Sequence, residues 1–564
     1  MIQHYYTNER NHQIVIALLK AHGIHQVVVS PGSCNSVFVG SIQSDPFFKL
    51  YSAVDERSAA YIACGLAQRT GEPVVINCTG ATAARNYMSG ATEAFYSKLP
   101  ILILTSSQPN NRVGHLFSQV TDRTSPPSDT CRFSDTLPIV KSPDEEWECE
   151  VKTNNALLEL KRHGGGPVHL NLVTTYSYSQ ITALTQKELP PVRVIKRFYI
   201  NDNLPEIPEG RIGVFIGEHN IWSKKETSAL EHFCESNNAV VFCDHTSNYH
   251  GCYRIPCALT INQAVLNQAN KPAFEVDVLI HIGEVSGEEG AMRMIHGNET
   301  WRVSKDGEIR DAFRNMTNVF EMSEEVFFTS YSKKDNNNVS YYEECSKIHQ
   351  EYYKTSESQM AIIPFSNVWI GRNIAPMIPN DSTVLLSILN SLRTWNYSDF
   401  NETVIVYSPV GGFGIDGVLS MTLGTSLAQP DKPCYCVIGD LAFFYDLNTL
   451  GNRHIGNNVR ILLVNNGCGV EFKKTYALAY RLLEEDVMPY VSAAGHFGAK
   501  SPDVVRNLVE NFGFEYMKAT NKDEFLKVRN RFTTPQLTEK PMLLECFVDA
   551  DEDIKALNII HNRI

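Results

Sequence analysis

Short apolar segments that alternate with helical patterns are the feature that most constrains the fold of this chain. In the first third, the runs IHQVVVS, FKLYSAV, PVVINCT and PILILTS are separated by helix-like stretches such as NERNHQIVIALLKAHG and ERSAAYIACGLAQRTG. Runs rich in Val and Ile that lack a polar face are typical of parallel strands covered by helices on both sides. The sequence therefore predicts an α/β protein built from doubly wound parallel sheets.

The alternation is interrupted twice, which predicts three α/β domains. Pro190, Pro191 and the stretch NDNLPEIPEG resemble a linker, and YSKKDNNNVSYYEE (331–344) has few apolar anchors and reads as an exposed connection. The length of 564 residues fits three to four domains at roughly 150 residues per domain. We expect domains at residues 1–185, 195–335 and 360–564, whose similar sizes are compatible with distant copies of one unit.

Charge and cysteine usage exclude several classes of protein. A formal net charge of −13 argues against a large face that tracks nucleic-acid phosphates. The 14 cysteines mostly stand alone in apolar stretches, as Cys64 and Cys243 do, which favours buried thiols in a reducing compartment. The chain starts without the pattern of a signal peptide, and no apolar run reaches the ~18 residues of a membrane span. We expect a cytoplasmic protein with no membrane partner.

The strongest chemical signal lies in the last third, at the ends of two apolar strands. PCYCVIGD ends at Gly439 and Asp440, and VRILLVNNGCG carries Asn466. Carboxyl ends of parallel strands are where open α/β sheets bind ligands, and carboxylate and amide oxygens suit Mg²⁺ beside phosphate oxygens. Gly439 would let the backbone approach a phosphate, and a helix after Asp440 would present free N–H groups. The simpler alternative is a helix-capping Asp and an Asn in a turn.

A second motif supports a rival reading. GFGIDG at 412–417 matches the dinucleotide fingerprint G-x-G-x-x-G, and Asp440 follows 28 residues after Gly412, where a ribose-binding acid is expected. An NAD-dependent enzyme is therefore an alternative. Against it, the fingerprint normally opens the first strand-to-helix turn of its domain, whereas STVLLSI precedes it here.

Six segments together resemble the thiamine-diphosphate-dependent enzymes. They are VVVSPGSCNS (27–36), VDERSAAYIACGLAQRTGEPV (54–74), CTGATAARNY (78–87), GIDGVLSMTLG (414–424), GDLAFFYDLNTL (439–450) and LLVNNGCG (462–469). Within that family the resemblance is closest to the 2-succinyl-5-enolpyruvyl-6-hydroxy-3-cyclohexene-1-carboxylate synthases of menaquinone biosynthesis. It covers the first and last domains well, and the middle domain only by size and position.

The resemblance implies a cofactor, a metal and an assembly. It implies a first domain that binds the aminopyrimidine of thiamine diphosphate, a central accessory domain, and a third domain that binds the diphosphate through Mg²⁺. Sites of this family lie between the first domain of one subunit and the third of another, which implies a homodimer or homotetramer. The sequence leaves open whether the central domain binds a ligand such as FAD.

Single positions can be carried over from the family. Glu56, at a strand end, resembles the acid that hydrogen-bonds the aminopyrimidine and so favours removal of the thiazolium C2 proton; without the resemblance, it reads as an acid that stabilises the start of a helix. Thr79 and Thr82 resemble pyrimidine-side residues, and Ile415 the apolar residue beneath the cofactor. Asp440, Asn466 and the carbonyl of Cys468 resemble the metal ligands. The remaining cofactor-binding candidates are Gly414, Gly439, Leu441, Ala442, Gly469 and Val470.

The chain departs from the synthases where they hold anionic substrates. Arginines of that group are replaced by Cys34, Gln108, Val410 and Trp395, although Arg393 lies two positions from the last. Each lost guanidinium removes a carboxylate clamp, at roughly 1.5–3 kcal/mol per charged hydrogen bond. We therefore predict conserved cofactor chemistry with a different substrate, in a pocket whose substrate-binding candidates are Ser33, Cys34, Gln108, Arg393 and Phe472.

Three further residues are catalytic candidates beside Glu56. Glu471, two residues past Gly469, could relay protons if burial raises the pKa of its carboxyl; the alternative is an exposed acid that pairs with Lys473 or Lys474. His115 and Gln119 lie in RVGHLFSQ, whose family counterpart borders the active site, although a single His is more often structural.

These observations favour a Mg²⁺- and thiamine-diphosphate-dependent enzyme that decarboxylates a 2-oxo acid and passes the acyl carbanion to an acceptor. The alternatives are a genuine menaquinone-pathway synthase, a simple 2-oxo acid decarboxylase, an acetolactate-synthase-like carboligase acting on an uncharged acceptor such as a sugar ketone, the NAD-dependent enzyme, and a non-catalytic paralogue. The sequence does not identify the donor acid, the acceptor or the stereochemistry.

Overall fold

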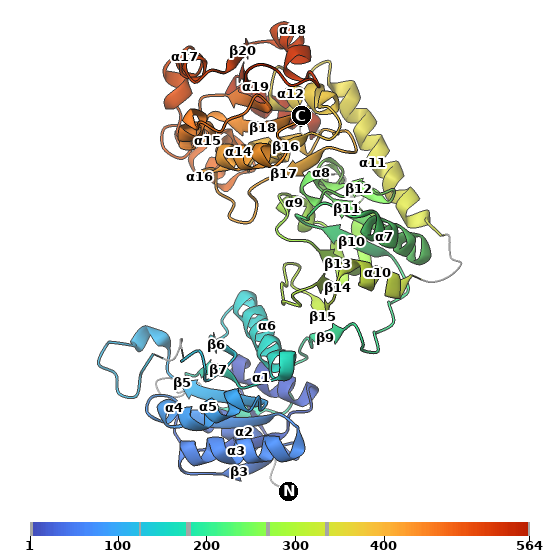
Figure 1. Ribbon diagram of the computed structural model, residues 1–564. Helices are drawn as coiled ribbons and strands as arrows, with labels where there is room; N and C mark the ends of the chain where they lie inside the picture. Colours follow the sequence, from blue (N-terminus) through green and yellow to red (C-terminus); the bar gives the residue numbers. More distant parts are fainter. Residues whose placement is uncertain (1–3, 123–125, 176–181, 267–270, 333–337, 562–564) are drawn as a thin grey trace. The chain divides into compact units, whose positions relative to one another are not determined.

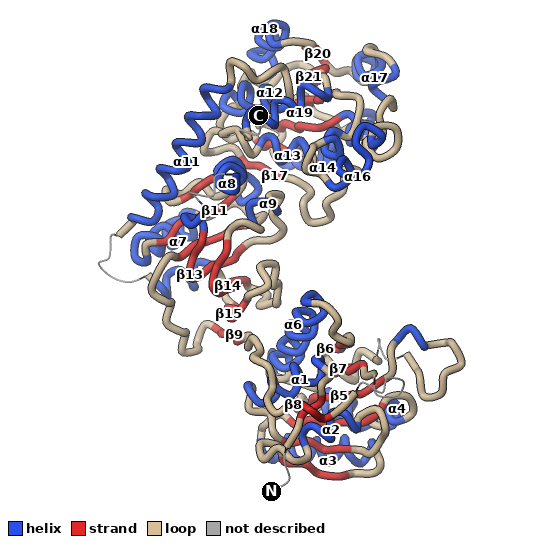
Figure 2. The backbone as a smooth tube through the Cα atoms, turned by 180° about the vertical axis from the view of Figure 1, so that it is seen from behind, coloured by secondary structure: helices blue, strands red, loops and turns tan. Residues whose placement is uncertain are grey.

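The computed structural model describes residues 4–122, 126–175, 182–266, 271–332 and 338–561. The chain divides into two compact units, one of residues 1–198 with 307–319 and one of residues 199–306 with 320–564. Parallel sheets flanked by helices build both units, as the α/β prediction requires (Figures 1 and 2). The three domain boundaries drawn from the sequence stay a prediction.

The first unit is organised around a six-stranded parallel sheet with the order β3-β2-β4-β5-β7-β6. Its elements are β1 (Tyr6–Thr7), α1 (Arg10–Ala21), β2 (Gln26–Val29), α2 (Ser36–Ile42), β3 (Lys49–Ser52), α3 (Glu56–Thr70), β4 (Val74–Thr79), α4 (Ala83–Asn86), α5 (Met88–Tyr96), β5 (Ile101–Ser107), β6 (Phe133–Leu137), α6 (Pro143–Glu159), β7 (Val168–Val173), β8 (Leu184–Gln186) and β9 (Lys196–Tyr199).

Alternating side chains of this sheet fill two separate cores. Val75 and Leu102 pack with the helices α1, α2 and α6 on one face. Ile76 and Ile103 pack with α3, α4 and α5 on the other. Burial on both faces explains why these strands are apolar throughout rather than alternating with polar residues.

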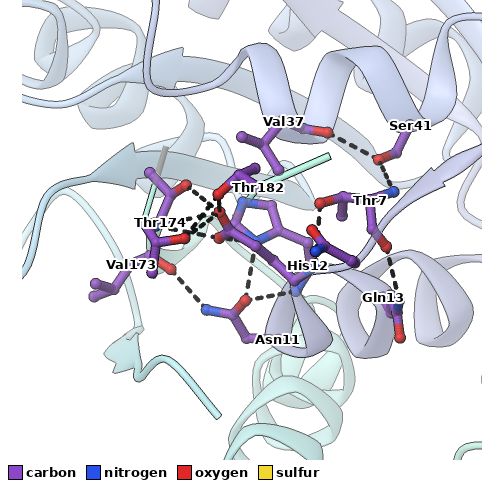
Figure 3. Close-up of polar contacts among 12 residues, drawn as sticks. Thr7, Asn11, His12, Gln13, Val37, Ser41, Val173, Thr174 and Thr182 are labelled. Atoms are coloured by element: carbon purple, nitrogen blue, oxygen red, sulfur yellow. Dashed lines mark hydrogen bonds and ion pairs between the residues drawn. The ribbon is translucent and has the colours of Figure 1, made fainter. Parts of the chain in front are cut away.

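A buried polar cluster fastens the N-terminus of the first unit to the carboxyl end of β7 (Figure 3). The carboxylate of Glu9 accepts hydrogen bonds from the hydroxyls of Thr174, at 3.0 Å, and Thr182, at 2.7 Å. His12 lies 3.3 Å from the same carboxylate, and burial lowers its pKa to about 4. The amide of Asn11 donates to the carbonyl of Val173 at 2.7 Å. These bonds satisfy buried polar groups beside the start of α1.

The second unit contains two parallel arrangements of strands. The central one has the order β12-β11-β10-β13-β14. Its elements are β10 (Ile212–Ile216), α7 (Lys224–Asn237), β11 (Ala239–Cys243), β12 (Arg254–Pro256), α8 (Cys257–Leu266), β13 (Glu275–Ile282), α9 (Glu289–Met292) and β14 (His296–Ser304), followed by α10 (Glu324–Tyr331) and α11 (Ser340–Gln359). The strand β15 (Met316–Glu321) begins in the first unit and ends in the second.

The C-terminal sheet has six parallel strands in the order β17-β16-β18-β19-β21-β20. Its elements are α12 (Asn367–Ile374), β16 (Thr383–Leu386), α13 (Asn390–Trp395), β17 (Ile405–Tyr407), α14 (Val418–Ala428), β18 (Cys434–Gly439), α15 (Asp440–Tyr445), β19 (Val459–Asn465), α16 (Leu478–Leu483), α17 (Val504–Asn511), β20 (Glu515–Ala519), α18 (Lys522–Phe532), β21 (Met542–Phe547) and α19 (Ala550–Ile560).

The first and the C-terminal sheets have the same strand order. If the six strands of each are numbered along the chain, both sheets read 2-1-3-4-6-5. In both, the second strand lies on one side of the first and the third on the other, which leaves a crevice at the carboxyl ends of the first and third strands. The candidate site residues follow these strands.

Polar contacts join the central and C-terminal parts of the second unit. His245 Nε2 lies 2.7 Å from the carbonyl oxygen of Ser398, and the side-chain oxygen of Asn248 accepts from the backbone N–H of Val406 at 2.9 Å. Ala258 and Leu259 of α8 are part of the core that α12 and α19 form over the C-terminal sheet. This shared core explains why both parts belong to one compact unit.

The connection expected at residues 331–344 is only partly described. Residues 333–337 lie outside the described residues. Residues 340–344 form the start of α11, in which Tyr341 is buried and Ser340, Glu343 and Glu344 are exposed. Two buried side chains, Tyr341 and Cys345, give this otherwise polar helix enough apolar contact to pack.

The cysteines of this chain are free thiols. All 14 are among the described residues, and only Cys252 is exposed. None of the helices in the described ranges combines the length and apolar character needed to cross a bilayer.

Candidate functional site

A cavity of about 110 Å³ opens at the carboxyl edge of the C-terminal sheet, where the strand order reverses between β16 and β18. It is lined by residues at or after the ends of β16, β18 and β19, together with Ile415 after β17 and the first residue of α12. The lining comprises Asn367, Ser387, Ile388, Leu389, Asn390, Ser391, Ile415, Gly439, Asp440, Leu441, Ala442, Val464, Asn466, Cys468, Gly469, Val470, Glu471 and Phe472. Most of the residues that the sequence analysis assigned to this domain therefore meet at one place.

Asp440 is the most deeply buried charged group of this cavity, with 2% of its surface exposed. Burial raises the pKa of its carboxyl to about 7, although the backbone N–H groups of Leu441 and Gly467 donate to it and oppose the shift. Its Oδ2 atom is buried and has no hydrogen-bond partner among the described residues. A buried carboxylate oxygen without a donor is costly, and a bound cation would remove that cost.

Asn466 and Cys468 supply further oxygen atoms beside Asp440. The Oδ1 atom of Asn466 accepts weakly from the backbone N–H of Cys468, at 3.4 Å. The carbonyl of Cys468 accepts from the N–H of Val470, at 3.1 Å, and its second lone pair stays available. One carboxylate, one amide and one carbonyl form a hard oxygen donor set that fits Mg²⁺ with phosphate and water as further ligands.

Gly439 and Ile415 face the same cavity. A Cβ atom built on Gly439 would meet nothing within 4 Å, so the missing side chain leaves open space at the cavity wall. Ile415 is half-buried and packs against the core beneath α14. Gly414 does not line the cavity. A Cβ atom built on Gly414 would approach the Oδ1 atom of Asp416 to 2.3 Å.

The candidates of the first unit lie at the carboxyl edge of its own sheet. Glu56 begins α3, and its Oε2 accepts from the side-chain amide of Asn86 at 2.9 Å. Asp55 caps the same helix and accepts from Asn86 at 2.6 Å. Thr79 ends β4, and Thr82 precedes α4. The structure thus places Glu56 in a polar, half-exposed environment with a fixed donor.

A close backbone approach holds the loops after β2 and β4 together. A Cβ atom on Gly32 would come within 2.7 Å of the Thr79 side chain, so only glycine fits this turn. The amide of Asn35 donates to the carbonyl of Ser30 and to the side chain of Asn77, both at 2.9 Å. The Pro-Gly turn of the sequence therefore positions the start of α2 against the end of β4.

The remaining first-unit candidates differ in accessibility. Ser33 is exposed and Cys34 is buried. Gln108 follows β5 and accepts from Arg112 at 2.7 Å. His115 and Gln119 are both exposed in the loop after β5.

Glu471 forms a compact ion-pair cluster at the cavity wall. Its Oε1 lies 2.5 Å from Arg393 Nη1, and its Oε2 lies 2.7 Å from Lys474 Nζ. Burial alone would raise the pKa of Glu471, but the two cations outweigh it and hold the pKa below its ordinary value. The expectation of a raised pKa for Glu471 is therefore wrong, and Lys474 is the partner that the simpler alternative named.

Two positions where the family resemblance led us to expect arginine lie in the core of this chain. Trp395 is fully buried, and its indole N–H donates to the side chain of Asn367 at 3.0 Å. Val410 is also buried in the core over the C-terminal sheet. Neither residue lines the cavity.

Several polar residues at these two edges were missed by the sequence analysis. Asn86 bonds Glu56, and Asn367, Asn390 and Ser391 line the cavity. Asn390 and Ser391 begin α13, the helix that follows β16. Because β16 is the first strand of its sheet, the strand order places the segment after it at the ligand-binding crevice. Asn367 comes from a distant helix, and its local sequence gives no signal of this role.

Comparisons with known proteins agree with this arrangement. A family model described as the thiamine pyrophosphate enzyme, N-terminal TPP binding domain, matches residues 10–125. Three 2-succinyl-5-enolpyruvyl-6-hydroxy-3-cyclohexene-1-carboxylate synthases align with almost the whole chain. The protein of Bacteroides thetaiotaomicron is 29% identical over 99% of both chains, that of Phocaeicola vulgatus 29% over 98% of both, and that of Lysinibacillus sphaericus 25% over 98% of this chain and 97% of its own.

The chain is therefore similar to the thiamine pyrophosphate enzymes over residues 10–125 and to the synthases along almost its whole length. The matched segment 10–125 contains Glu56, Thr79 and Thr82. This similarity makes the NAD reading of GFGIDG unnecessary. In the structure, that motif follows β17, which is the edge strand of the sheet and not its first strand.

Proposed function

We propose that this thiamine-diphosphate-dependent enzyme uses Mg²⁺ to decarboxylate a 2-oxo acid and transfers the resulting acyl carbanion to an acceptor. The observation that carries the proposal is the corner of Asp440, Asn466 and Cys468 at the cavity of the C-terminal sheet. Its buried carboxylate oxygen without a donor and its open glycine wall fit a metal-bound diphosphate.

The residues of the C-terminal sheet would bind and orient the cofactor. Asp440, Asn466 and the Cys468 carbonyl would hold Mg²⁺, and Gly439 would admit the diphosphate. Ile415 would support the cofactor from its half-buried position beside α14. Gly414, Leu441, Ala442, Gly469 and Val470 are the other proposed cofactor contacts. Thiamine diphosphate, when bound, supplies the nucleophile and electron sink that loss of CO₂ from a 2-oxo acid requires.

Glu56 would hold a proton at the aminopyrimidine ring nitrogen, with Thr79 and Thr82 beside that ring. Asn86 fixes the Glu56 carboxyl in the structure, so the acid would be oriented before the cofactor binds. His115, Gln119 and Glu471 stay candidates for contact with the substrate, as do Ser33, Cys34, Gln108, Arg393 and Phe472.

We infer a substrate different from that of the aligned synthases. Cys34, Gln108, Val410 and Trp395 stand where the family resemblance implies substrate-binding arginines, and Arg393 is engaged by Glu471. An uncharged acceptor such as a sugar ketone, or a proton in simple decarboxylation, would fit this loss.

A second candidate function is that of a genuine menaquinone-pathway synthase. It is favoured by the alignment over 99% of the chain with such a synthase. Incubation with 2-oxoglutarate and isochorismate separates the two candidates, because formation of the coupled product would establish the synthase and its absence would exclude it.

We also propose a homodimer or homotetramer in the cytoplasm. Exposed apolar side chains on α3, among them Tyr61 and Ile62, and on the segment around α16, among them Leu482 and Tyr490, would be covered in such an assembly. The free thiols support a reducing compartment.

The test of the proposal begins with cofactor binding. Calorimetry with thiamine diphosphate and Mg²⁺ should show tight binding that EDTA abolishes. Asp440→Asn should weaken the binding by about 100-fold or more, because the metal loses its anionic ligand. Asp431→Asn is the matched control, since Asp431 is exposed and precedes the opposite end of β18.

Assays of CO₂ release over small 2-oxo acids complete the test. Glu56→Gln should lower the rate by about 10²–10⁴-fold while cofactor binding persists. Glu72→Gln is the control, because Glu72 precedes β4 at the other edge of the sheet. Unchanged CO₂ release by the Glu56 variant would contradict the mechanism.

A further inference from the structure

The ion-pair cluster of Glu471, Arg393 and Lys474 has an arrangement that bears on substrate choice. Glu471 follows β19 and lines the cavity, Arg393 belongs to α13, and Lys474 ends the turn that starts at Val470. Exposed fractions of the side chains are 12% for Glu471, 28% for Arg393 and 3% for Lys474. The cluster is therefore largely withdrawn from water, where charge pairing matters most.

Each oxygen of the Glu471 carboxylate has its own cation. Arg393 Nη1 contacts Oε1 at 2.5 Å, and Lys474 Nζ contacts Oε2 at 2.7 Å. A guanidinium and an ammonium converging on two oxygens form the arrangement that binds a ligand carboxylate. In this chain, a carboxylate of the protein itself occupies it.

The rest of the cavity offers no replacement for these cations. Among the described residues that line it, the charged ones are Asp440 and Glu471, both acidic. Ile388, Leu389 and Phe472 add apolar surface to the wall. If Mg²⁺ neutralises Asp440, the only charged side chain left in the described lining is Glu471, whose carboxylate is already paired. A bound 2-oxo acid would otherwise meet uncharged and apolar groups.

We propose that Glu471 is a built-in counter-ion that fills the carboxylate subsite, so that the enzyme selects a 2-oxo acid with an uncharged side chain over a dicarboxylic one. This rests on the proposed decarboxylation of a 2-oxo acid. A dicarboxylic donor would have to displace Glu471 from both cations or leave its second carboxylate unpaired in a poorly hydrated cavity. Glu471 and Asp440 line the same cavity, whereas Arg393 and Lys474 contact the Glu471 carboxylate without lining it.

A matched pair of donors tests the selection in the native enzyme. 2-Oxoglutarate and 2-oxoglutaramate have the same length and differ in a distal carboxylate against an amide. With bound cofactor, the enzyme should release CO₂ from the amide with a kcat/KM about 10-fold or more above that for the dicarboxylate. A preference for 2-oxoglutarate would overturn the proposal.

Removal of the counter-ion should shift the preference toward the dicarboxylic donor. Glu471→Gln frees both cations, and the ratio of kcat/KM for 2-oxoglutarate to kcat/KM for the amide should gain about 10-fold or more. Adding Arg393→Gln to this variant should abolish the gain, because one of the two cations is lost. Glu485→Gln is the control, since Glu485 is an exposed partner of Lys473 outside the cavity. A Glu471 variant that melts normally and gains nothing would overturn the proposal.

A binding measurement separates this inference from the proposed function. Glutarate does not react, so calorimetry without cofactor reports the subsite alone: Glu471→Gln should bind it about 10-fold or more tightly than the native protein. Equal binding by both proteins overturns the inference. If the native enzyme releases CO₂ from no 2-oxo acid, the proposed function fails, while the glutarate result still decides whether Glu471 fills the subsite. If Glu471→Gln does not fold, the preference of the native enzyme between the two donors decides.

Discussion

Four carboxyl groups of the second unit lie largely out of solvent, and they differ in the charge of their partners. Asp440 receives backbone N–H groups, and Asp553 receives the backbone N–H of Asn367 at 2.7 Å. Glu288 receives the side-chain amide of Asn396 at 3.1 Å, and Glu471 receives two cations. Burial raises the pKa to about 7 for Asp440, about 6 for Asp553 and about 7 for Glu288, while cations lower that of Glu471. Partner charge decides the direction of each shift.

Glu288→Gln should change how stability depends on pH. Burial, followed by the nearby Asp244, raises the pKa of Glu288 from 4.5 to about 7, so the native state keeps the proton longer than the unfolded state. Its contribution to stability is present below pH 4.5 and is lost as the pH rises to about 7. The variant avoids this loss, and its free energy of unfolding should exceed the native value by on the order of 3 kcal/mol at pH 8, with no difference near pH 4.

Denaturant unfolding across this pH range measures the effect. Glu206→Gln, an exposed acid in the loop before β10, should show no pH-dependent difference. A constant gap between native protein and the Glu288 variant at all pH values would contradict the assignment.

Residues that follow a strand were the ones that the sequence could reveal. Asp440 and Asn466 come directly after apolar runs, so their common edge was predictable without the structure. Glu288 and Asp553 gave no signal, because their burial depends on packing between segments far apart in the chain. The pKa direction of Glu471 was missed for the same reason, since Arg393 lies 78 residues away.

Helix packing in the first unit depends on small residues at the contact between α3 and α5. A Cβ atom on Gly90 of α5 would come within 2.4 Å of the Cβ of Ala60 on α3. Ala59, Ala60, Ala63 and Ala67 are all buried along α3. Because neither helix carries a large side chain there, their backbones approach closely, and α3 presents Glu56 at its first residue.

Gly90→Ala should therefore destabilise the protein, by about 1–3 kcal/mol, through overpacking. Gly65→Ala is the matched control on α3, because a Cβ there meets nothing within 4 Å. Its higher helix propensity should leave stability unchanged or raise it by up to about 1 kcal/mol. Thermal and denaturant unfolding compare the two, and equal effects of both changes would refute the packing argument.

Central strands and the edge strand β3 were predictable as elements, whereas the edge strands β6 and β20 were not. β2, β4, β5, β18 and β19 coincide with apolar runs of the sequence. β6 (FSDTL) and β20 (EYMKA) lie at or beside solvent at sheet edges, so their composition is mixed.

At the scale of the whole molecule, the family resemblance implies that a complete site needs two subunits. Mixing inactive Glu56→Gln with inactive Asp440→Asn subunits after dissociation should then restore activity. Random exchange in a dimer with two sites gives about a quarter of the native sites in intact form. A CO₂ assay before and after exchange measures the recovery.

The exchange has a built-in control. Reassociation of either variant with itself should restore nothing, because every site then lacks the same group. If mixed dimers form, as tagged subunits would reveal, and activity stays absent, the shared site is excluded.

The common strand order of the first and C-terminal sheets has a consequence for engineering and ancestry. In both, the turn after the third strand carries candidate ligands: Thr79 in one sheet, Gly439 and Asp440 in the other. In the proposed function, one strand order would serve an organic ring in the first sheet and a metal ion in the C-terminal sheet. Exchanging the turns after the third strands of the two sheets would then show how much of the surrounding framework a change of ligand requires.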